Sequence, residues 1–142
     1  MSTEQNKAAS RRIVEAINKG DIAAIDELVA PTLVDHSIPP GIPPGIEGVK
    51  FFISTFHITF PDLHYHIEDE VAEGDRVVQR LTGHGTMKGD LQGMPATGKH
   101  ATWWEIHVGR FANGKLVEHW ANIDQVGQLQ QLGLMPPPGQ GG

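Results

Sequence analysis

The chain contains no cysteine, a single tyrosine among its 142 residues, and no long run of apolar residues. Without cysteine it can form no disulfide, no thiolate metal site and no cysteine nucleophile. No stretch approaches the roughly 20 apolar residues that a transmembrane helix requires, and the N-terminal segment lacks the apolar core of a signal peptide. We therefore expect a cytoplasmic protein with no membrane partner.

Positive charge is scarce relative to negative charge. The 11 Lys and Arg residues against 17 Asp and Glu residues give a net charge of −6. This field repels phosphate backbones, which argues against nucleic acid as a partner. With 39% hydrophobic residues, the length suits one compact domain with its own core. We place that domain at residues 1–134, followed by a Pro- and Gly-rich C-terminal tail at residues 135–142.

The first half of the chain has a helical period. Apolar residues recur at helical spacing in three segments, which predicts helices at residues 4–19, 22–30 and 46–60. Ser2 and Gln5 stand at the spacing of a capping box for the first helix, and Asp21 can cap the second. A brief extended piece follows at 33–37. The proline loop PPGIPPG at 39–45 cannot be regular structure, and it can rim an opening.

The second half alternates apolar and polar residues with a period of two. This pattern predicts four strands, at residues 63–71, 76–87, 100–111 and 115–123. Asn113 and Gly114 form the two-residue turn that joins the last pair. Three helices followed by a four-strand meander indicate an α+β fold, with the helices laid across one face of a curved antiparallel sheet.

The Asn-Gly turn also predicts the register of the last two strands. It sets Ala112 opposite Lys115 and therefore His107 opposite Trp120, while His119 falls on the other face in a structural role. In the absence of a bulge, one face of the sheet carries Trp103, Glu105, His107, Trp120, Asn122 and Asp124. Each buried polar group without a partner costs about 1–3 kcal/mol, so such a face indicates a functional site.

Asp124 is the candidate general acid and base of this site. Enclosure beside tryptophan raises the pKa of an aspartate, by up to about 3–5 units when burial is complete. His107 is the second catalytic candidate, because it can orient this carboxylate or share its proton. The candidate substrate-binding residues are Trp103, Glu105, Trp120, Asn122 and, beside the proline loop, His36. A competing interpretation makes Asp124 the N-cap of a short terminal helix.

Both faces of the last hairpin are half apolar. The face away from the helices therefore needs another cover, most simply a second copy of the chain. We expect a homodimer through this sheet face.

Several segments, taken in order, resemble a known family. They are the FPD tripeptide at 60–62, EGDRVV, Gly85-Thr86, GMPATGK, RFANGKLVEHW with Asp124, and QQLG. Over about residues 5–134 they are similar to the SnoaL-like polyketide cyclases of the nuclear transport factor 2-like superfamily. The resemblance implies a cone-shaped α+β barrel around a pocket that binds a small apolar or aromatic polyketide. It also implies that Asp124 catalyses intramolecular aldol ring closure with no metal or organic cofactor.

Other activities remain open at this point. A ketosteroid-isomerase-like site would need a tyrosine donor, and Tyr65 lies on a different strand. An epoxide hydrolase would need a cationic member in an Asp-Arg-Asp relay, for which Arg80 is available. A third possibility is a protein that binds a small molecule without catalysis. A cupin-like metal spacing is present in His64, His66 and Glu70, although a solvated strand face also explains these residues.

Overall fold

The computed structural model describes residues 2–137 and 139. In this range the chain forms α1 (Thr3–Lys19), α2 (Ile22–Leu28), β1 (Val29–Asp35), α3 (Gly45–Thr59), β2 (His64–Glu73), β3 (Arg76–Thr86), β4 (His100–Ala112), β5 (Lys115–Ile123) and α4 (Gln125–Gln131). All predicted helices and strands are present. None of the helices in the described part of the chain combines the length and apolar character of a membrane span. The predicted tail lies partly outside the described residues.

Both predicted helix caps are present. The Gln5 backbone N–H donates to Ser2 Oγ at 3.1 Å, and the Ser2 N–H donates to Gln5 Oε1 at 2.9 Å. At α2, the Ala24 N–H donates to the Asp21 carboxylate at 3.2 Å. These bonds satisfy backbone donors that have no partner within the helix, which is why each helix begins where the sequence predicts.

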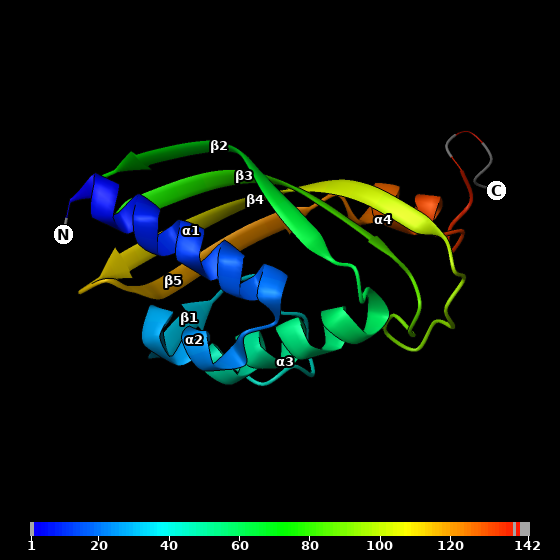
Figure 1. The fold of residues 1–142 in the computed structure, drawn as a ribbon, viewed down its shortest axis with the longest axis horizontal. Coiled ribbons are helices and arrows are strands. Elements are labelled where there is room, and N and C mark those ends of the chain that lie inside the picture. Colours follow the sequence, from blue (N-terminus) through cyan, green and yellow to red (C-terminus); the bar gives the residue numbers. More distant parts are fainter. Residues whose placement is uncertain (1, 138, 140–142) are drawn as a thin grey trace.

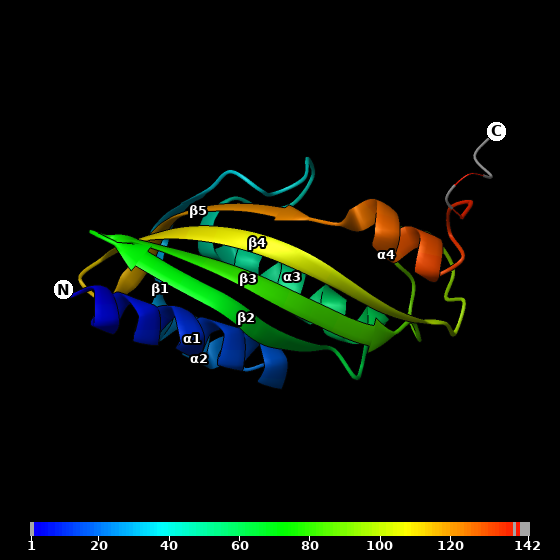
Figure 2. The same cartoon turned by 90° about the horizontal axis from the view of Figure 1, so that it is seen from above.

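The strands form one curved sheet in the order β1-β5-β4-β3-β2. Neighbours from β5 to β2 are antiparallel, as predicted, whereas β1 pairs with β5 in parallel. Figure 1 shows α1, α2 and α3 on one side of the sheet, and α1 runs beside β2. Figure 2 shows the sheet arching over α3, with α4 continuing from the end of β5. The α+β prediction, with helices across one face, is confirmed.

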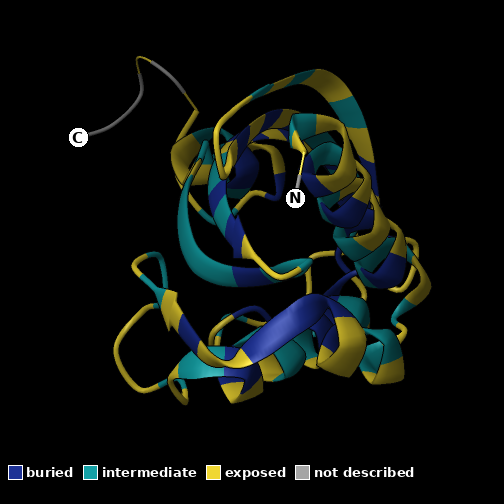
Figure 3. Ribbon diagram, turned by 90° about the vertical axis from the view of Figure 1, so that its left-hand side faces the viewer, coloured by how far each residue is buried: buried dark blue, intermediate teal, exposed yellow. Residues whose placement is uncertain are grey.

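Buried residues alternate with exposed or intermediate ones along β3 and most of β4. Figure 3 shows the resulting bands of buried and exposed residues along the ribbon. The inner face carries buried side chains such as Val77, Leu81 and Trp103. The outer face carries large apolar side chains that are exposed, namely Val71, Val78, Trp104 and Ile106. No described helix of the chain covers this outer face, so dimerisation through it stays a prediction.

The predicted register of β4 and β5 is wrong beyond the first two pairs. Ala112 pairs with Lys115 and Phe111 with Leu116, as predicted, but Arg110 then pairs with Glu118. Val117 is therefore the extra residue of a β-bulge, and every later side chain on β5 points to the opposite face from the one predicted. The pairs that follow are Gly109 with His119, Val108 with Trp120, His107 with Ala121, Ile106 with Asn122 and Glu105 with Ile123.

The bulge has a physical cause in the side chains around it. Leu116 and Phe111 pack over Gly109, where an added Cβ would lie only 2.8 Å from Leu116 Cδ1. On the outer face, Arg110 Nε donates to Glu118 Oε1 at 2.9 Å. The extra residue keeps Leu116 buried while bringing the two charges together. Its consequence is that His119 points inward and Trp120 outward.

Candidate active site

The helices and the inner face of the sheet enclose a cavity of about 350 Å³. This volume is in the range of small-molecule sites. Most of the wall is apolar, with Ile13, Val14 and Ile17 from α1, Val49, Phe52, Ile53 and Phe56 from α3, and Pro39 and Ile42 from the proline loop. The prediction that this loop rims an opening is consistent with its place in the wall.

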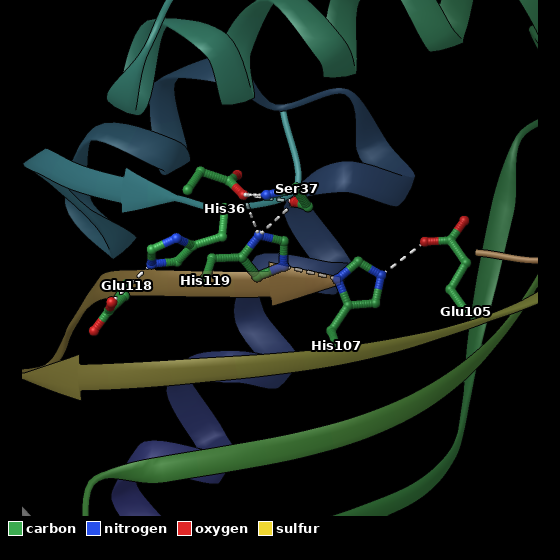
Figure 4. Close-up of polar contacts among 7 residues, drawn as sticks. His36, Ser37, Glu105, His107, Glu118 and His119 are labelled. Carbon is green, nitrogen blue, oxygen red and sulfur yellow. Dashed lines mark hydrogen bonds and ion pairs between the residues drawn. The ribbon is translucent and has the colours of Figure 1, made fainter. Parts of the chain in front are cut away.

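Four side chains form a hydrogen-bonded row along the cavity (Figure 4). His119 Nδ1 lies 3.0 Å from Asp35 Oδ1, and His119 Nε2 lies 2.8 Å from His107 Nδ1. His107 Nε2 lies 2.7 Å from Glu105 Oε1. We call Asp35, His119, His107 and Glu105 the row. It joins three strands, because Asp35 ends β1, His119 lies on β5, and the other two lie on β4.

Glu105 is the enclosed end of the row, with a side chain that is 6% exposed. Its Oε2 accepts hydrogen bonds from Tyr65 Oη at 2.8 Å and from Trp103 Nε1 at 2.7 Å. Burial raises the pKa of the Glu105 carboxyl, but the bonds from His107, Trp103 and Tyr65 outweigh burial and hold this pKa below its usual value. Burial and the neighbouring Glu105 charge raise the pKa of Tyr65 well above its usual value.

Asp35 is the other end, with a side chain that is 7% exposed. Its Oδ1 accepts from the Ser37 N–H at 2.9 Å and from the Ser37 hydroxyl at 2.6 Å, in addition to His119. Burial raises the pKa of Asp35, but the bonds from His119 and Ser37 outweigh it, so the pKa is lowered. Within the described residues no side chain or backbone group bonds to Asp35 Oδ2. Asp35 therefore presents one uncommitted carboxylate oxygen in a residue that lines the cavity.

Comparison with known proteins places the chain in a family. The sequence profile of the SnoaL-like polyketide cyclases matches residues 7–132. The chain belongs to the SnoaL-like polyketide cyclase family. It is 31% identical over 141 residues to aklanonic acid methyl ester cyclase DauD of Streptomyces sp. (strain C5), covering 92% of this chain and 83% of that one. It is 30% identical over 140 residues to aklanonic acid methyl ester cyclase DnrD of Streptomyces peucetius, covering 92% of each.

Solved structures agree with this assignment. TsrD from Streptomyces laurentii superimposes with a TM-score of 0.87 at 28% identity, covering 95% of this chain and 99% of that one. Wild-type IdmH from Streptomyces antibioticus superimposes with a TM-score of 0.81 at 33% identity, covering 91% of this chain and 99% of that one. The resemblance found in the sequence and the fold that it implied are both confirmed.

In this SnoaL-like chain, Asp124 lies outside the row. Its side chain is the N-cap of α4 and accepts a hydrogen bond from the Gly127 N–H at 3.0 Å. It does not belong to the set of residues that line the cavity. The competing interpretation from the sequence, a helix cap, is confirmed. Trp120, which was predicted to lie on the same face as Asp124 and to contact the substrate, is turned to the outer face by the bulge.

The structure brings together only part of the predicted substrate-binding set. Glu105 lines the cavity with His107, and Trp103 is buried behind Glu105 as its hydrogen-bond donor. On the outer face, Trp120 stacks on His36 with ring centroids 5.0 Å apart. His36 is exposed, and its ring bonds to Glu118 at 2.8 Å. Asn122 is exposed and borders the cavity without joining the row.

Four residues of the site were not predicted, namely Asp35, Ser37, His119 and Tyr65, which reaches Glu105 from β2 and lines the cavity. His119 was assigned to the wrong face because the bulge at Val117 leaves no mark in the apolar pattern. Asp35 and Ser37 flank the predicted candidate His36 in the sequence. Their place in the site follows only from the parallel pairing of β1 with β5, which sets Asp35 beside His119.

The residues of two rival activities lie apart. Arg80, the candidate cation of an epoxide hydrolase, lies on the outer face and bonds to Asp69 at 2.6 Å. Glu70 bonds to Arg11 and Gln79, whereas His64 and His66 are exposed on the outer face. In the described range, no group of three or more His, Asp or Glu side chains is arranged to hold a metal ion.

Proposed function

We propose that the protein catalyses ring closure of an aromatic polyketide bound in the cavity, with Asp35 as the general acid and base. The family assignment and the relatives named as aklanonic acid methyl ester cyclases support this reaction class. One observation supports the choice of residue. Asp35 is a carboxylate that lines the cavity, with Oδ1 bound by three donors and Oδ2 uncommitted. This assignment replaces Asp124, which caps a helix.

Asp35 is also the member of the row that can accept a proton with the least disturbance. Both ring nitrogens of His107 and both of His119 already take part in hydrogen bonds. An imidazole that took the substrate proton would first have to break one of them. A proton that arrives on Asp35 Oδ2 leaves every contact of the row in place.

The reaction needs one group that takes a proton and then returns it. The Asp35 carboxylate removes a proton from a carbon next to a carbonyl group, and the resulting enolate carbon attacks a second carbonyl carbon of the same molecule. A carbon–carbon bond forms, and the second carbonyl oxygen becomes an alkoxide, which takes the proton from Asp35. Because the proton returns to the same molecule, we propose that no metal or organic cofactor takes part.

The walls of the cavity suit a flat, mostly apolar ligand. Phe52 and Phe56 both line it, and their rings stack with centroids 4.2 Å apart. Polar groups concentrate in the row. An aromatic polyketide can therefore pack its rings against the apolar wall while its carbonyl groups meet the row. The cavity holds both reacting carbons of the polyketide close together. The substrate therefore loses less conformational entropy on reaching the transition state, which accelerates ring closure.

The direct test supplies the chain, in the presence of EDTA, with aklanonic acid methyl ester and with nogalonic acid methyl ester, for which a 28% identical relative from Streptomyces nogalater is named. We expect a ring-closed product, identified by chromatography and mass spectrometry, that is not formed by the heat-unfolded chain. Binding of either ester without conversion would favour the non-catalytic alternative. If the chain neither binds nor converts any aromatic polyketide ester, the proposal is overturned.

A further inference from the structure

The row has more hydrogen-bond contacts than two neutral histidines can supply with protons. It contains three contacts: Asp35 Oδ1 with His119 Nδ1, His119 Nε2 with His107 Nδ1, and His107 Nε2 with Glu105 Oε1. Each contact is a hydrogen bond only if one proton lies in it, so the row needs three protons. Two neutral imidazoles carry one proton each. The Ser37 hydroxyl lies 3.3 Å from His119 Nδ1, but it donates to Asp35 Oδ1 at the shorter distance of 2.6 Å and so fills none of the three contacts. The third proton is therefore an additional one, either on an imidazole or on a carboxyl group.

The surroundings of the two carboxylates place that proton on the imidazoles. Asp35 Oδ1 already accepts two bonds from Ser37, and Glu105 Oε2 accepts bonds from Tyr65 and Trp103. Acceptance of several bonds favours the ionised form of a carboxylate. The lowered pKa values of both carboxyl groups agree with this. His107 and His119 together then carry a single positive charge.

That charge has two positions within a 2.8 Å contact. If the proton is on His119 Nε2, the imidazolium is His119, directly beside Asp35. If the proton crosses to His107 Nδ1, the imidazolium is His107, beside Glu105. The two rings stack with centroids 5.1 Å apart, so the crossing moves the charge by one ring without moving the side chains. A positive charge beside Asp35 makes it a weaker base, and a more distant one makes it a stronger base.

We propose that His107 and His119 share one proton, and that its crossing from one ring to the other switches Asp35 between base and acid during ring closure. This inference rests on the proposed function, because it takes Asp35 as the acting group. With the charge on His107, Asp35 can take the substrate proton. When the charge returns to His119, Asp35 can give that proton to the alkoxide. His107 and His119 are positioning residues in this scheme.

Other charged groups around the pair do not replace the two carboxylates. On β3, Gln79 lies opposite His107 and bonds to Glu70, which is paired with Arg11 of α1. On β2, Tyr65 bonds to Glu105 and not to either ring. On β5, Glu118 points to the outer face and pairs with Arg110 and His36. The part of α3 that lines the cavity is uncharged.

Nuclear magnetic resonance of the whole chain, labelled with ¹⁵N in its histidine rings, tests the inference without substrate. At neutral pH we expect three protons on the four ring nitrogens of His107 and His119. As the pH rises, both rings should report the loss of one proton in a single shared transition. His36→Gln, which alters a histidine on the outer face, should leave that transition unchanged. Two protons on the pair at neutral pH, or separate transitions at the two rings, would overturn the inference.

The pH profile of turnover links this proton to catalysis. In the wild type, kcat should fall at the pH where the pair loses its shared proton. In His119→Gln, that limb of the profile should disappear, because His107 then has no ring with which to share. If the proton count holds but no polyketide ester is converted, the proposed function fails, and the shared proton stands without its role in ring closure. If Asp35→Asn abolishes turnover but the pair carries two protons, the inference fails alone.

Discussion

Replacement of Asp35 by asparagine is expected to lower kcat for ring closure by about 10²- to 10⁴-fold, the usual contribution of a general acid or base. The substitution keeps the size and shape of the side chain. The asparagine carbonyl oxygen can still accept the bonds from Ser37 and His119 that hold Asp35 in place. The amide nitrogen in the place of Oδ2 cannot take a proton from the substrate. KM should change little, because the apolar walls are unaltered.

Asp124→Asn is the matched control, because it makes the same chemical change at the carboxylate that the sequence favours. Asparagine is as good an N-cap as aspartate, so α4 should remain intact and kcat should stay close to that of the wild type. Steady-state kinetics of both variants decide between the two residues. Loss of turnover in Asp124→Asn, with turnover retained in Asp35→Asn, would reverse the assignment. Urea denaturation of both variants verifies that each is folded.

Glu105→Gln is expected to reduce the free energy of unfolding by about 3–5 kcal/mol, as is typical when one partner of a buried charged pair is removed. Donors approach Glu105 from two sides, with His107 on Oε1 and both Tyr65 and Trp103 on Oε2. A glutamine side chain has one carbonyl oxygen, so its amide N–H₂ must face donors on one side. Since the residue is only 5% exposed, water cannot replace the lost acceptor.

Urea denaturation at neutral pH, followed by tryptophan fluorescence, measures this loss. Glu118→Gln is the control, because that carboxylate also bonds to a histidine, His36, but lies on the outer face where solvent screens it. We expect only a small change there. Equal losses in the two variants would show that burial of Glu105 is not what makes its bonds important.

The loss of stability in acid gives a second readout for Glu105→Gln. The pKa values of Asp35 and Glu105 are lowered in the folded state. A carboxyl group whose pKa is lowered in the folded state stabilises the fold at pH values above its pKa in the unfolded state, about 4. This stabilisation is lost as the pH falls through the lower pKa of the folded state. The wild type should therefore lose stability below about pH 4. Glu105→Gln should lose less over the same range, since the contribution of the Glu105 carboxylate is gone.

Local features of the sequence were sufficient to predict most of the fold. The capping box of Ser2 and Gln5, the cap at Asp21 and the Asn113-Gly114 turn each set an element boundary through hydrogen bonds between close neighbours. The change of apolar period from helix to strand separated the two halves of the chain. Such signals depend on residues a few positions apart, which a single sequence displays directly.

The site could be predicted only in part, because it depends on pairings between distant segments. Glu105 and His107 were found, since both point inward at alternate positions of one strand. Asp35 reaches His119 through a parallel pairing across 84 residues, for which no periodic signal exists. The bulge at Val117 reverses the face of every later residue on β5. Because of this one extra residue, His119 lies in the site where the sequence predicted Trp120.

A crystal structure of the chain with a ring-closed ester bound in the cavity tests the central claim most directly. The hydroxyl oxygen formed by ring closure, or the adjacent carbon that lost its proton, should lie within hydrogen-bond reach of Asp35 Oδ2, about 2.6–3.2 Å. The row from Asp35 to Glu105 should remain intact beside it. A product whose new hydroxyl lies against Asp124, or far from both ends of the row, would contradict the account.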